Sequence, residues 1–189
     1  MIVRSKQNFA NRLAAYAPQG VRTNTGRHEM IQRLMLANDT VTVATEVPVY
    51  IRREDLAHMQ TQLGFELYKK PAAGDLEPMS PEELPRLITG HIDAVQIRNG
   101  QIHILDYKPN AAKEKPIEQL TLYALALSRL TGLRLFEFKC AWFDEKDYFE
   151  FYPLHVVYKR RRGRARKRII TKEGIYEVNQ SSARVARLK

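Results

Sequence analysis

The sequence predicts an α/β protein in which a mixed central sheet is flanked by helices. Apolar and polar residues alternate in several short runs, and longer stretches carry apolar residues at helical spacing. The sharpest strand signal is Asn99-Gly100, which joins two alternating runs, because a two-residue turn of this kind needs left-handed backbone at both positions. With 189 residues, 44% hydrophobic and 28% charged, the chain has the composition of a globular protein.

In the first half of the chain, two helices are expected before the first strand. The first covers residues 6–17 and ends at the break Pro18-Gln19-Gly20. The second covers residues 26–37, with Asn24 or Thr25 as its N-cap. The first strand is expected at residues 41–51.

The interval 52–85 carries mixed signals. Residues 54–63 follow a helical pattern and residues 65–69 an extended one. Residues 71–85 are rich in turn formers, which makes this stretch a candidate lid over a cleft.

The second half of the chain supplies the rest of the sheet. Strands are expected at residues 90–98 and 101–108, on the two sides of the Asn-Gly turn. A helix follows at residues 115–130, with Gly132 near its C-terminal stop, and strands at residues 135–143 and 148–158 complete the sheet.

The hairpin turn also sets which side chains face one another. With Arg98 opposite Gln101, pairing outward from the turn brings Asp93 opposite Asp106. Alternation then places Lys108 on the face of both acids. Opposed carboxylates repel each other, so a cation is expected between them. Mg²⁺ suits two converging carboxylates, and Lys108 would add a charge beside the metal-bound water or the scissile phosphate.

The alternative is that both acids are solvated on an exposed sheet face. The apolar residues expected on the same face as the acids are Val95, Ile97, Ile102 and Ile104. The opposite face would carry Ala94, Leu105 and Tyr107. Because a carboxylate at the rim of an apolar face is costly without a partner, this pattern favours a metal site in a cleft.

Four separated motifs accompany the hairpin. They are Gly26-Arg27-His28, Gly90-His91-Ile92-Asp93, Asp106-Tyr107-Lys108 and Gln119-Leu120-Thr121-Leu122-Tyr123. In this order they resemble the motifs of the RecB-like branch of the PD-(D/E)XK nucleases. Ile92 stands where the superfamily name has proline, a common departure in this branch. The resemblance implies a restriction-endonuclease-like αβββαβ core.

The resemblance also implies roles for the site residues. Asp93 and Asp106 would bind the metal, with the backbone carbonyl of Tyr107 as a further ligand, and Lys108 would orient or activate the attacking water. His28 would add an imidazole ligand from the second helix. The alternative for His28 is a histidine satisfied within the core, because apolar residues follow it at helical spacing.

Three further residues have two interpretations each. Glu46 is expected to be an auxiliary ligand, or else an edge-strand glutamate close to Pro48, which also marks an edge. Gln119 and Tyr123 are four residues apart and share one helix face. The resemblance implies that they contact the DNA backbone or support the lysine; the alternative is ordinary amphipathic packing.

The activity implied is Mg²⁺-dependent hydrolysis of DNA that leaves a 5′-phosphate and a 3′-hydroxyl, with Mn²⁺ substituting for Mg²⁺. Such a metal neutralises developing charge and lowers the pKa of a bound water. Exonuclease and endonuclease modes both remain open, as do recombination, repair, replication and defence. The alternative is a catalytically inactive nuclease fold that serves as a DNA-binding or accessory subunit.

The positive charge of the chain is concentrated at its C-terminal end. Residues 159–189 hold 12 Lys and Arg against Glu173 and Glu177, which accounts for the whole net charge of +10. The densest cations are Lys159, Arg160, Arg161, Arg162, Arg164, Arg166, Lys167 and Arg168. We expect a nuclease-like domain at 1–158 and a DNA-binding basic arm at 159–189. The alternatives for the arm are a solvated tail or a nuclear localisation signal.

The segment beyond this cationic run alternates at residues 169–171 and 174–178, which suggests a terminal hairpin packed on the same domain. Cys140 is the single cysteine, so neither a disulfide framework nor a four-cysteine iron–sulphur cluster is expected. No phosphate-binding Gly-x-x-x-x-Gly-Lys-Ser/Thr loop occurs, so ATP-driven activity would need a partner such as a helicase or another recombination or replication subunit.

The chain has no apolar run of membrane-spanning length and no signal-peptide pattern at its start. We therefore expect an intracellular, cytoplasmic protein without membrane partners. Nucleoid association and a viral or phage origin are left open.

Overall fold

The computed structural model describes residues 2–17, 21, 23–63, 68–69, 77–157, 167–171, 174–178 and 185–187. The chain divides into two compact units, Met1–Tyr158 and Lys159–Lys189. The first part of the candidate lid, residues 71–76, and the first part of the basic arm, residues 159–166, lie outside the described residues. None of the helices among the described residues has the length and apolar character that crossing a membrane requires.

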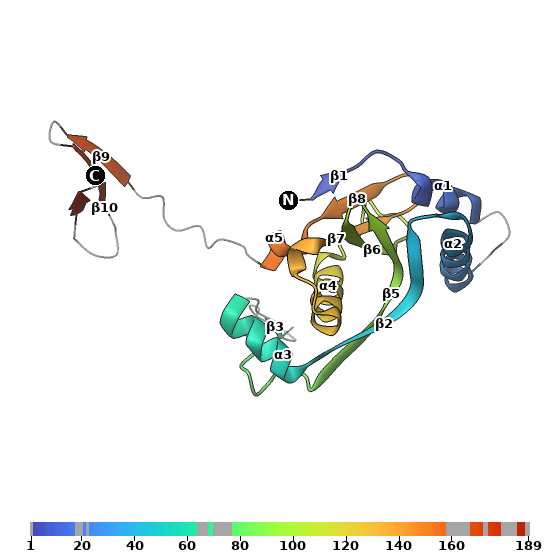
Figure 1. Cartoon of the computed structure of the whole chain (residues 1–189), viewed down its shortest axis with the longest axis horizontal. Helices are drawn as coiled ribbons and strands as arrows, with labels where there is room; N and C mark the ends of the chain where they lie inside the picture. The colour runs from blue at the N-terminus through green and yellow to red at the C-terminus, as the bar shows by residue number, and fades with distance from the viewer. Residues whose placement is uncertain are drawn as a thin grey trace. The chain divides into compact units, whose positions relative to one another are not determined.

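A six-stranded mixed sheet forms the centre of the first unit (Figure 1). Its strands are β1 (Val3–Arg4), β2 (Thr42–Arg52), β5 (Leu87–Arg98), β6 (Gln101–Tyr107), β7 (Phe138–Phe143) and β8 (Tyr148–Phe151). Their order is β1-β8-β7-β6-β5-β2, so β2 is an edge strand. β6 and β7 pair in parallel, while the other neighbours pair antiparallel. The expected mixed sheet is confirmed.

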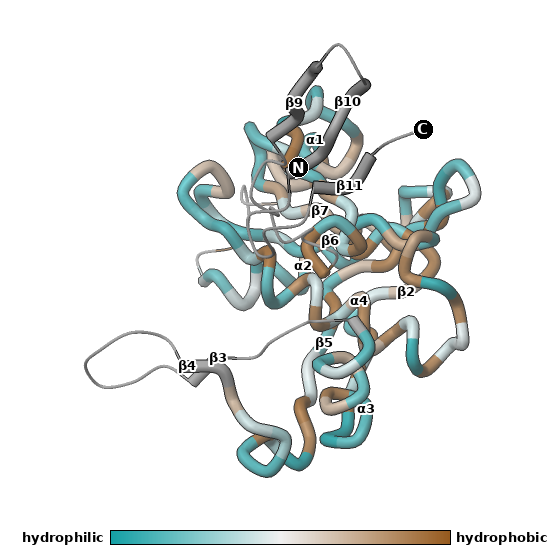
Figure 2. The backbone as a smooth tube through the Cα atoms, turned by 90° about the vertical axis from the view of Figure 1, so that its left-hand side faces the viewer, coloured by the Kyte–Doolittle hydropathy of each residue, from teal (hydrophilic) through white to brown (hydrophobic). Residues whose placement is uncertain are grey.

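Helices cover both faces of this sheet. They are α1 (Phe9–Tyr16), α2 (Asn24–Asn38), α3 (Arg53–His58), the π-helical turn η2 (Met59–Leu63), α4 (Ile117–Thr131), the 3₁₀ turn η3 (Leu135–Glu137) and α5 (Pro153–Val157). Ile104 of β6 belongs to the same buried cluster as Leu120 of α4. Its neighbour Leu105 belongs to a second cluster, with Leu13 of α1 and Ile31 of α2. Because neighbouring strand residues point to opposite faces, α4 covers one face and α1 with α2 the other. In Figure 2 hydrophobic and hydrophilic stretches alternate along the tube of the first unit, in the helices as well as in the strands.

The hairpin between β5 and β6 has the register predicted from its turn. Asn99 and Gly100 both have left-handed backbone, with φ of 52° and 73°. Arg98 pairs with Gln101, and the ladder continues outward as far as Ala94 opposite Leu105. The turn alone therefore sets the register, because a two-residue loop leaves no freedom to slip.

Helix starts differ slightly from the prediction. Thr23 caps α2, so the expectation of Asn24 or Thr25 is wrong: Thr23 has extended backbone, and its hydroxyl accepts the Gly26 N–H at 3.2 Å. Asn8 caps α1 by accepting the Ala10 N–H at 2.9 Å, so that helix begins later than residue 6.

Two of the predicted strands are too long. The strand expected at 148–158 ends at Phe151, and Pro153 begins α5, because proline has no N–H for a ladder and suits a first helical turn. The strand expected at 135–143 begins at Phe138. Its first residues form η3, where the Glu137 carboxylate accepts the Arg134 N–H at 2.6 Å.

The interval between β2 and β5 contains the expected helix, as α3 and η2, and two short strands, β3 (Tyr68–Lys69) and β4 (Glu77–Pro78), which pair antiparallel. The second unit contains β9 (Lys167–Thr171), β10 (Gly174–Val178) and β11 (Val185–Arg187). Thr171 pairs with Gly174, which confirms the terminal hairpin. β11 pairs with β10 and was not expected.

Candidate active site

The candidate site forms at Asp93, where the ladders on both sides of β5 are interrupted. On one side, pairing with β6 stops at Ala94. On the other side, pairing with β2 omits the position where Glu46 falls opposite Asp93. Glu46 has φ of 52°, which is unusual for a residue with a side chain. The sheet is therefore open at the level of the two acids.

The interruption redirects the side chain of Asp93. Its Oδ2 accepts the backbone N–H of Tyr107 at 2.9 Å, in place of a strand-to-strand hydrogen bond. Ile92 and Val95 contact the same buried cluster, which strict alternation forbids. The expectation that Asp93 shares a face with Val95 and Ile97 is therefore wrong, because the strand is irregular at Asp93. Ile97 is also 53% exposed, so the apolar face does not extend to the turn.

Asp106 is the more buried of the two acids. It is 4% exposed, and Lys108 Nζ lies 3.0 Å from its Oδ2. Lys108 is therefore the cation that this carboxylate contacts. Lys108 is held by its backbone N–H, which donates to the Phe143 carbonyl of β7 at 2.9 Å. A buried carboxylate beside a second carboxylate is suited to a further cation, because burial and like charge both disfavour its ionised form.

The two carboxylates have opposite pKa shifts. Burial raises the pKa of Asp106 to about 7; the charge of Asp93 raises it further, and Lys108 opposes both. Burial also acts to raise the pKa of Asp93, but hydrogen bonds from His28 and from the Tyr107 N–H hold it below its ordinary value. Without a cation, Asp93 is therefore the carboxylate that stays ionised, and Asp106 is the one that retains a proton near neutral pH.

His28 reaches the site from α2, on the other side of the sheet from α4. Its Nδ1 lies 3.4 Å from Asp93 Oδ2, and its ring meets the Tyr107 ring edge-on at 5.0 Å between centroids. The hydrogen bond to Asp93 raises the pKa of His28, although burial opposes this. Ile31 and Met35 on the same helix are buried in the core, whereas the imidazole faces the acid. The ligand role of His28 stays a prediction.

Glu46 lies on the edge strand β2 and is exposed. Its Oε1 accepts a hydrogen bond from Nε2 of Gln32, a buried residue of α2. The register places Glu46 opposite Asp93, while its described partner is an amide rather than another acid. Its auxiliary ligand role stays a prediction, and its edge position agrees with the alternative interpretation.

The helix motif lies against β5 just before Asp93. Gln119 Nε2 donates to the Tyr123 hydroxyl at 2.9 Å, and Leu120 and Ala124 on the neighbouring stripe are fully buried. A Cβ atom on Gly90 would lie 2.4 Å from Cε1 of Tyr123. Gly90 is thus glycine because the tyrosine ring occupies the space of a side chain. The two residues belong to different sequence motifs, and only the fold shows that they touch.

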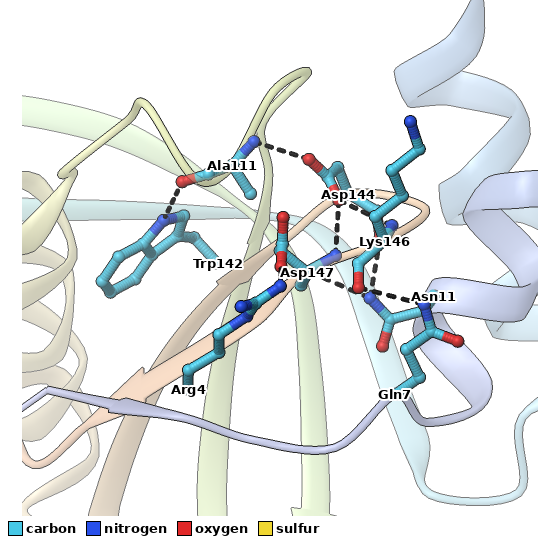
Figure 3. A network of polar contacts seen from close by, with 8 residues as sticks. All are labelled: Arg4, Gln7, Asn11, Ala111, Trp142, Asp144, Lys146 and Asp147. Carbon is cyan, nitrogen blue, oxygen red and sulfur yellow. Dashed lines mark hydrogen bonds and ion pairs between the residues drawn. The ribbon is translucent and has the colours of Figure 1, made fainter.

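A polar network holds the segment that follows Lys108 (Figure 3). Asp144 Oδ2 accepts the Ala111 N–H at 2.7 Å, and Trp142 Nε1 donates to the Ala111 carbonyl at 2.9 Å. Asn11 of α1 donates to the Asp144 carbonyl at 2.8 Å. Sequence analysis missed these residues. The signal was present in Asp144 itself, because an aspartate that begins a turn after a strand commonly accepts backbone N–H groups.

The residues present fit a hard divalent cation, although they do not form a complete ligand cage. Among the described residues, no three His, Cys, Asp or Glu side chains are spaced to hold a metal together. Mg²⁺ usually takes one or two carboxylates and completes its shell with water and substrate phosphate. Asp93 and Asp106 supply such a pair, and a cation between them would offset the repulsion that helps to raise the pKa of Asp106. The structure does not test the Tyr107 carbonyl as a ligand.

Comparison with protein families gives one match. A family model described as the PD-(D/E)XK nuclease superfamily matches residues 10–183. That range contains all four motifs and the whole of the candidate site. No curated protein matches the chain significantly.

Proposed function

Because the chain belongs to the PD-(D/E)XK nuclease superfamily, we propose that it is a Mg²⁺-dependent deoxyribonuclease of the RecB-like branch. It hydrolyses phosphodiester bonds and leaves 5′-phosphate and 3′-hydroxyl ends. The observation that carries the proposal is the pair of neighbouring carboxylates beside one lysine: Asp106 is buried, Lys108 Nζ lies 3.0 Å from its Oδ2, and the charge of Asp93 raises its pKa. Two carboxylates this close repel each other, and a bound cation would relieve that repulsion.

In this mechanism Asp93 and Asp106 would hold the ion. When bound, it would lower the pKa of a water molecule and neutralise charge on the phosphate. Lys108, fixed by its backbone bond to β7, orients the attacking water or donates to a non-bridging phosphate oxygen. His28 and the Tyr107 N–H hold the Asp93 carboxylate in place. Gln119 and Tyr123 contact the DNA backbone or position Lys108.

The basic arm adds affinity for DNA that is independent of its sequence, because Lys and Arg side chains release counterions from phosphates. Mn²⁺ substitutes for Mg²⁺, and neither ATP nor an iron–sulphur cluster is needed. The protein acts inside the cell, in recombination, repair, replication or defence. Any ATP-driven step belongs to a helicase or another subunit of such a complex.

The test uses the purified full chain with Mg²⁺, Mn²⁺ or EDTA, on linear and circular DNA in single- and double-stranded form. We expect cleavage with either metal and none with EDTA. Asp106→Ala and Lys108→Ala should each lower kcat by more than about 100-fold, the usual scale for removing a charge-stabilising group. Lys146→Ala, an exposed lysine on the β7–β8 turn, is the matched control. Ligation of the products, which needs a 5′-phosphate, checks the end groups.

Cleavage that persists in EDTA, or variants as active as the wild type, would contradict this mechanism. DNA binding without cleavage under every metal condition would instead favour the inactive, DNA-binding alternative.

A further inference from the structure

The strands β2 and β5 continue together beyond the rest of the sheet. β6 pairs with β5 only as far as Ala94, whereas β2 pairs with β5 down to Arg52 opposite Leu87. Figure 1 shows this two-stranded ribbon running past β6 toward α3. We call residues 46–52 and 87–93 the β2–β5 ribbon. One end of the ribbon lies at the candidate site, because Asp93 is the C-terminal residue of its β5 segment.

The ribbon has one buried and one exposed face. Val49, Ile51 and Ile92 are buried in the cluster that contains α4. The opposite face consists of residues that pair across the ribbon and are all exposed. They are Pro48, Tyr50, Arg52, Leu87, Thr89 and His91. We call these six residues the outer ribbon face.

The outer ribbon face leads directly to the candidate site. His91 lies two residues before Asp93, and Pro48 two residues after Glu46, which α2 contacts through Gln32. This is the side of the sheet from which His28 approaches Asp93. From Asp93 to Leu87 the ribbon extends about 20 Å at the usual rise of a strand. That length matches about six nucleotides of a stacked strand.

The chemistry of this face suits a nucleic acid with exposed bases. The Arg52 guanidinium lies 5.7 Å from the centroid of the Tyr50 ring, and Tyr50 is 42% exposed. The backbones of Arg53 and Arg86 pair at the end of the ribbon at 3.2 Å; the Arg53 Nε donates to the Leu84 carbonyl at 2.8 Å, whereas Arg86 is exposed. Cations that follow a backbone, beside aromatic rings on which bases stack, are the usual means of binding single strands.

We propose that the outer ribbon face binds a single strand of the substrate as it enters or leaves the candidate site. The inference rests on the proposed function, because the bound strand is taken to be the nuclease substrate. A paired duplex hides its base faces, so it would leave Tyr50 and Leu87 without a partner. A second copy of the chain is disfavoured too, because a two-fold contact would bring like-charged arginines together.

Fluorescence anisotropy of labelled oligothymidylates tests the proposal, with the full chain in EDTA so that no cleavage occurs. Tyr50→Ala and Arg52→Ala should each raise the Kd for a strand of about 12 nucleotides by about 5- to 10-fold, the effect of removing one stacking or cationic side chain. A strand of two nucleotides is too short to span from Asp93 to Tyr50, so its Kd should be the same for both variants and the wild type.

The chain offers a matched control pair. Arg134 lies 6.0 Å from the ring centroid of Phe136, which is 52% exposed, in the connection between α4 and β7. Arg134→Ala and Phe136→Ala therefore remove the same kinds of side chain outside the ribbon, and they should leave both Kd values at the wild-type level. Thermal unfolding of all four variants shows whether they are folded.

The outcomes separate this inference from the proposed function. If the wild type cleaves DNA but the ribbon variants bind the longer strand with the wild-type Kd, the ribbon inference is wrong and the proposed function still stands. If the wild type cleaves nothing while the ribbon variants lose affinity for the longer strand only, the binding face stands and the proposed activity is wrong. Ribbon variants that change the mass in solution without changing affinity would identify a contact between copies and overturn the proposal.

Discussion

The Tyr123 ring fills the space that a side chain at Gly90 would need: a Cβ atom on Gly90 would lie 2.4 Å from Cε1 of the ring and 3.0 Å from its hydroxyl oxygen. The contact joins β5 to α4 three residues before Asp93. Tyr123 in turn accepts a hydrogen bond from Gln119. Two motifs that are separate in the sequence are therefore one packed unit beside the candidate site.

We predict that Gly90→Ala displaces the tyrosine ring. Overpacking at such a contact usually costs about 1–3 kcal/mol of unfolding free energy. Urea unfolding measures this cost, and cleavage assays should show a parallel loss of activity. In the double variant with Tyr123→Ala the extra cost of Gly90→Ala should largely disappear, because the ring is gone. If the effects of the two substitutions simply add, the two residues do not compete for this space.

We predict that Asp106 gives the metal-free protein a contribution to stability that is lost as the pH rises. Burial raises the pKa of Asp106 to about 7 in the folded chain, against about 3.9 in an unfolded chain. Between these values the folded state binds the extra proton, so the contribution of Asp106 to the free energy of unfolding decreases from about pH 4 to pH 7.

Asp106→Asn should remove this slope. As the pH rises from 4 to 8 in EDTA, the free energy of unfolding of the variant should increase relative to that of the wild type by about 1–4 kcal/mol. Mg²⁺ at pH 8 should stabilise the wild type but not the variant. Thermal unfolding across this pH range measures both effects, and Asp55→Asn on α3 controls for loss of a carboxylate. An unchanged slope in Asp106→Asn would show that another group titrates.

A second pH effect is expected at the other end of the sheet, at His103. Burial, with help from Arg98 and Lys139, lowers the pKa of His103 to about 4. The Arg98 Nη2 lies 3.1 Å from its Nδ1, so the neutral ring accepts from the guanidinium. The unfolded chain binds a proton at about pH 6.5. The contribution of the neutral His103 ring to stability should therefore be complete above about pH 6.5 and should fall as the pH drops toward 4.

His103→Gln should reduce this acid loss, which is up to about 3 kcal/mol. His155→Gln, at an exposed position of α5, is the matched control. The two variants are compared by urea unfolding at pH 4.5 and pH 7, with Asp106→Asn as the common background so that its own titration does not interfere. Equal acid loss in both variants would rule out His103 as its source.

The basic arm should set the salt dependence of DNA binding. Replacing the eight cations from Lys159 to Arg168 by glutamine should weaken binding at low salt. It should also flatten the plot of log Kd against log salt by about 0.9 for each phosphate that the arm no longer neutralises. Thermal unfolding should be unchanged if this arm is a binding element. An unchanged Kd at low salt would assign DNA binding to other parts of the chain.

Local sequence signals were sufficient to predict much of the fold. Asn99-Gly100 determined the β5–β6 register, because left-handed backbone at two successive residues permits one turn geometry. The apolar stripe of α4 and its stop at Gly132, with φ of 73°, follow from helical spacing and from the freedom of glycine. The prediction of a strand at 148–158 is wrong after Phe151, because Pro153 begins a helix although the apolar alternation continues in the sequence.

The candidate site divides in the same way. The sequence by itself determined that Asp93 and Asp106 lie on paired strands, because both are counted from one turn. Only the tertiary structure decided that Asp93 turns toward the Tyr107 N–H, that His28 and Gln32 approach from α2, and that Gly90 makes room for Tyr123. These contacts join residues far apart in the chain, and no local spacing reports them. They exist because packing α2 and α4 on opposite faces of the sheet brings both helices to its break at Asp93.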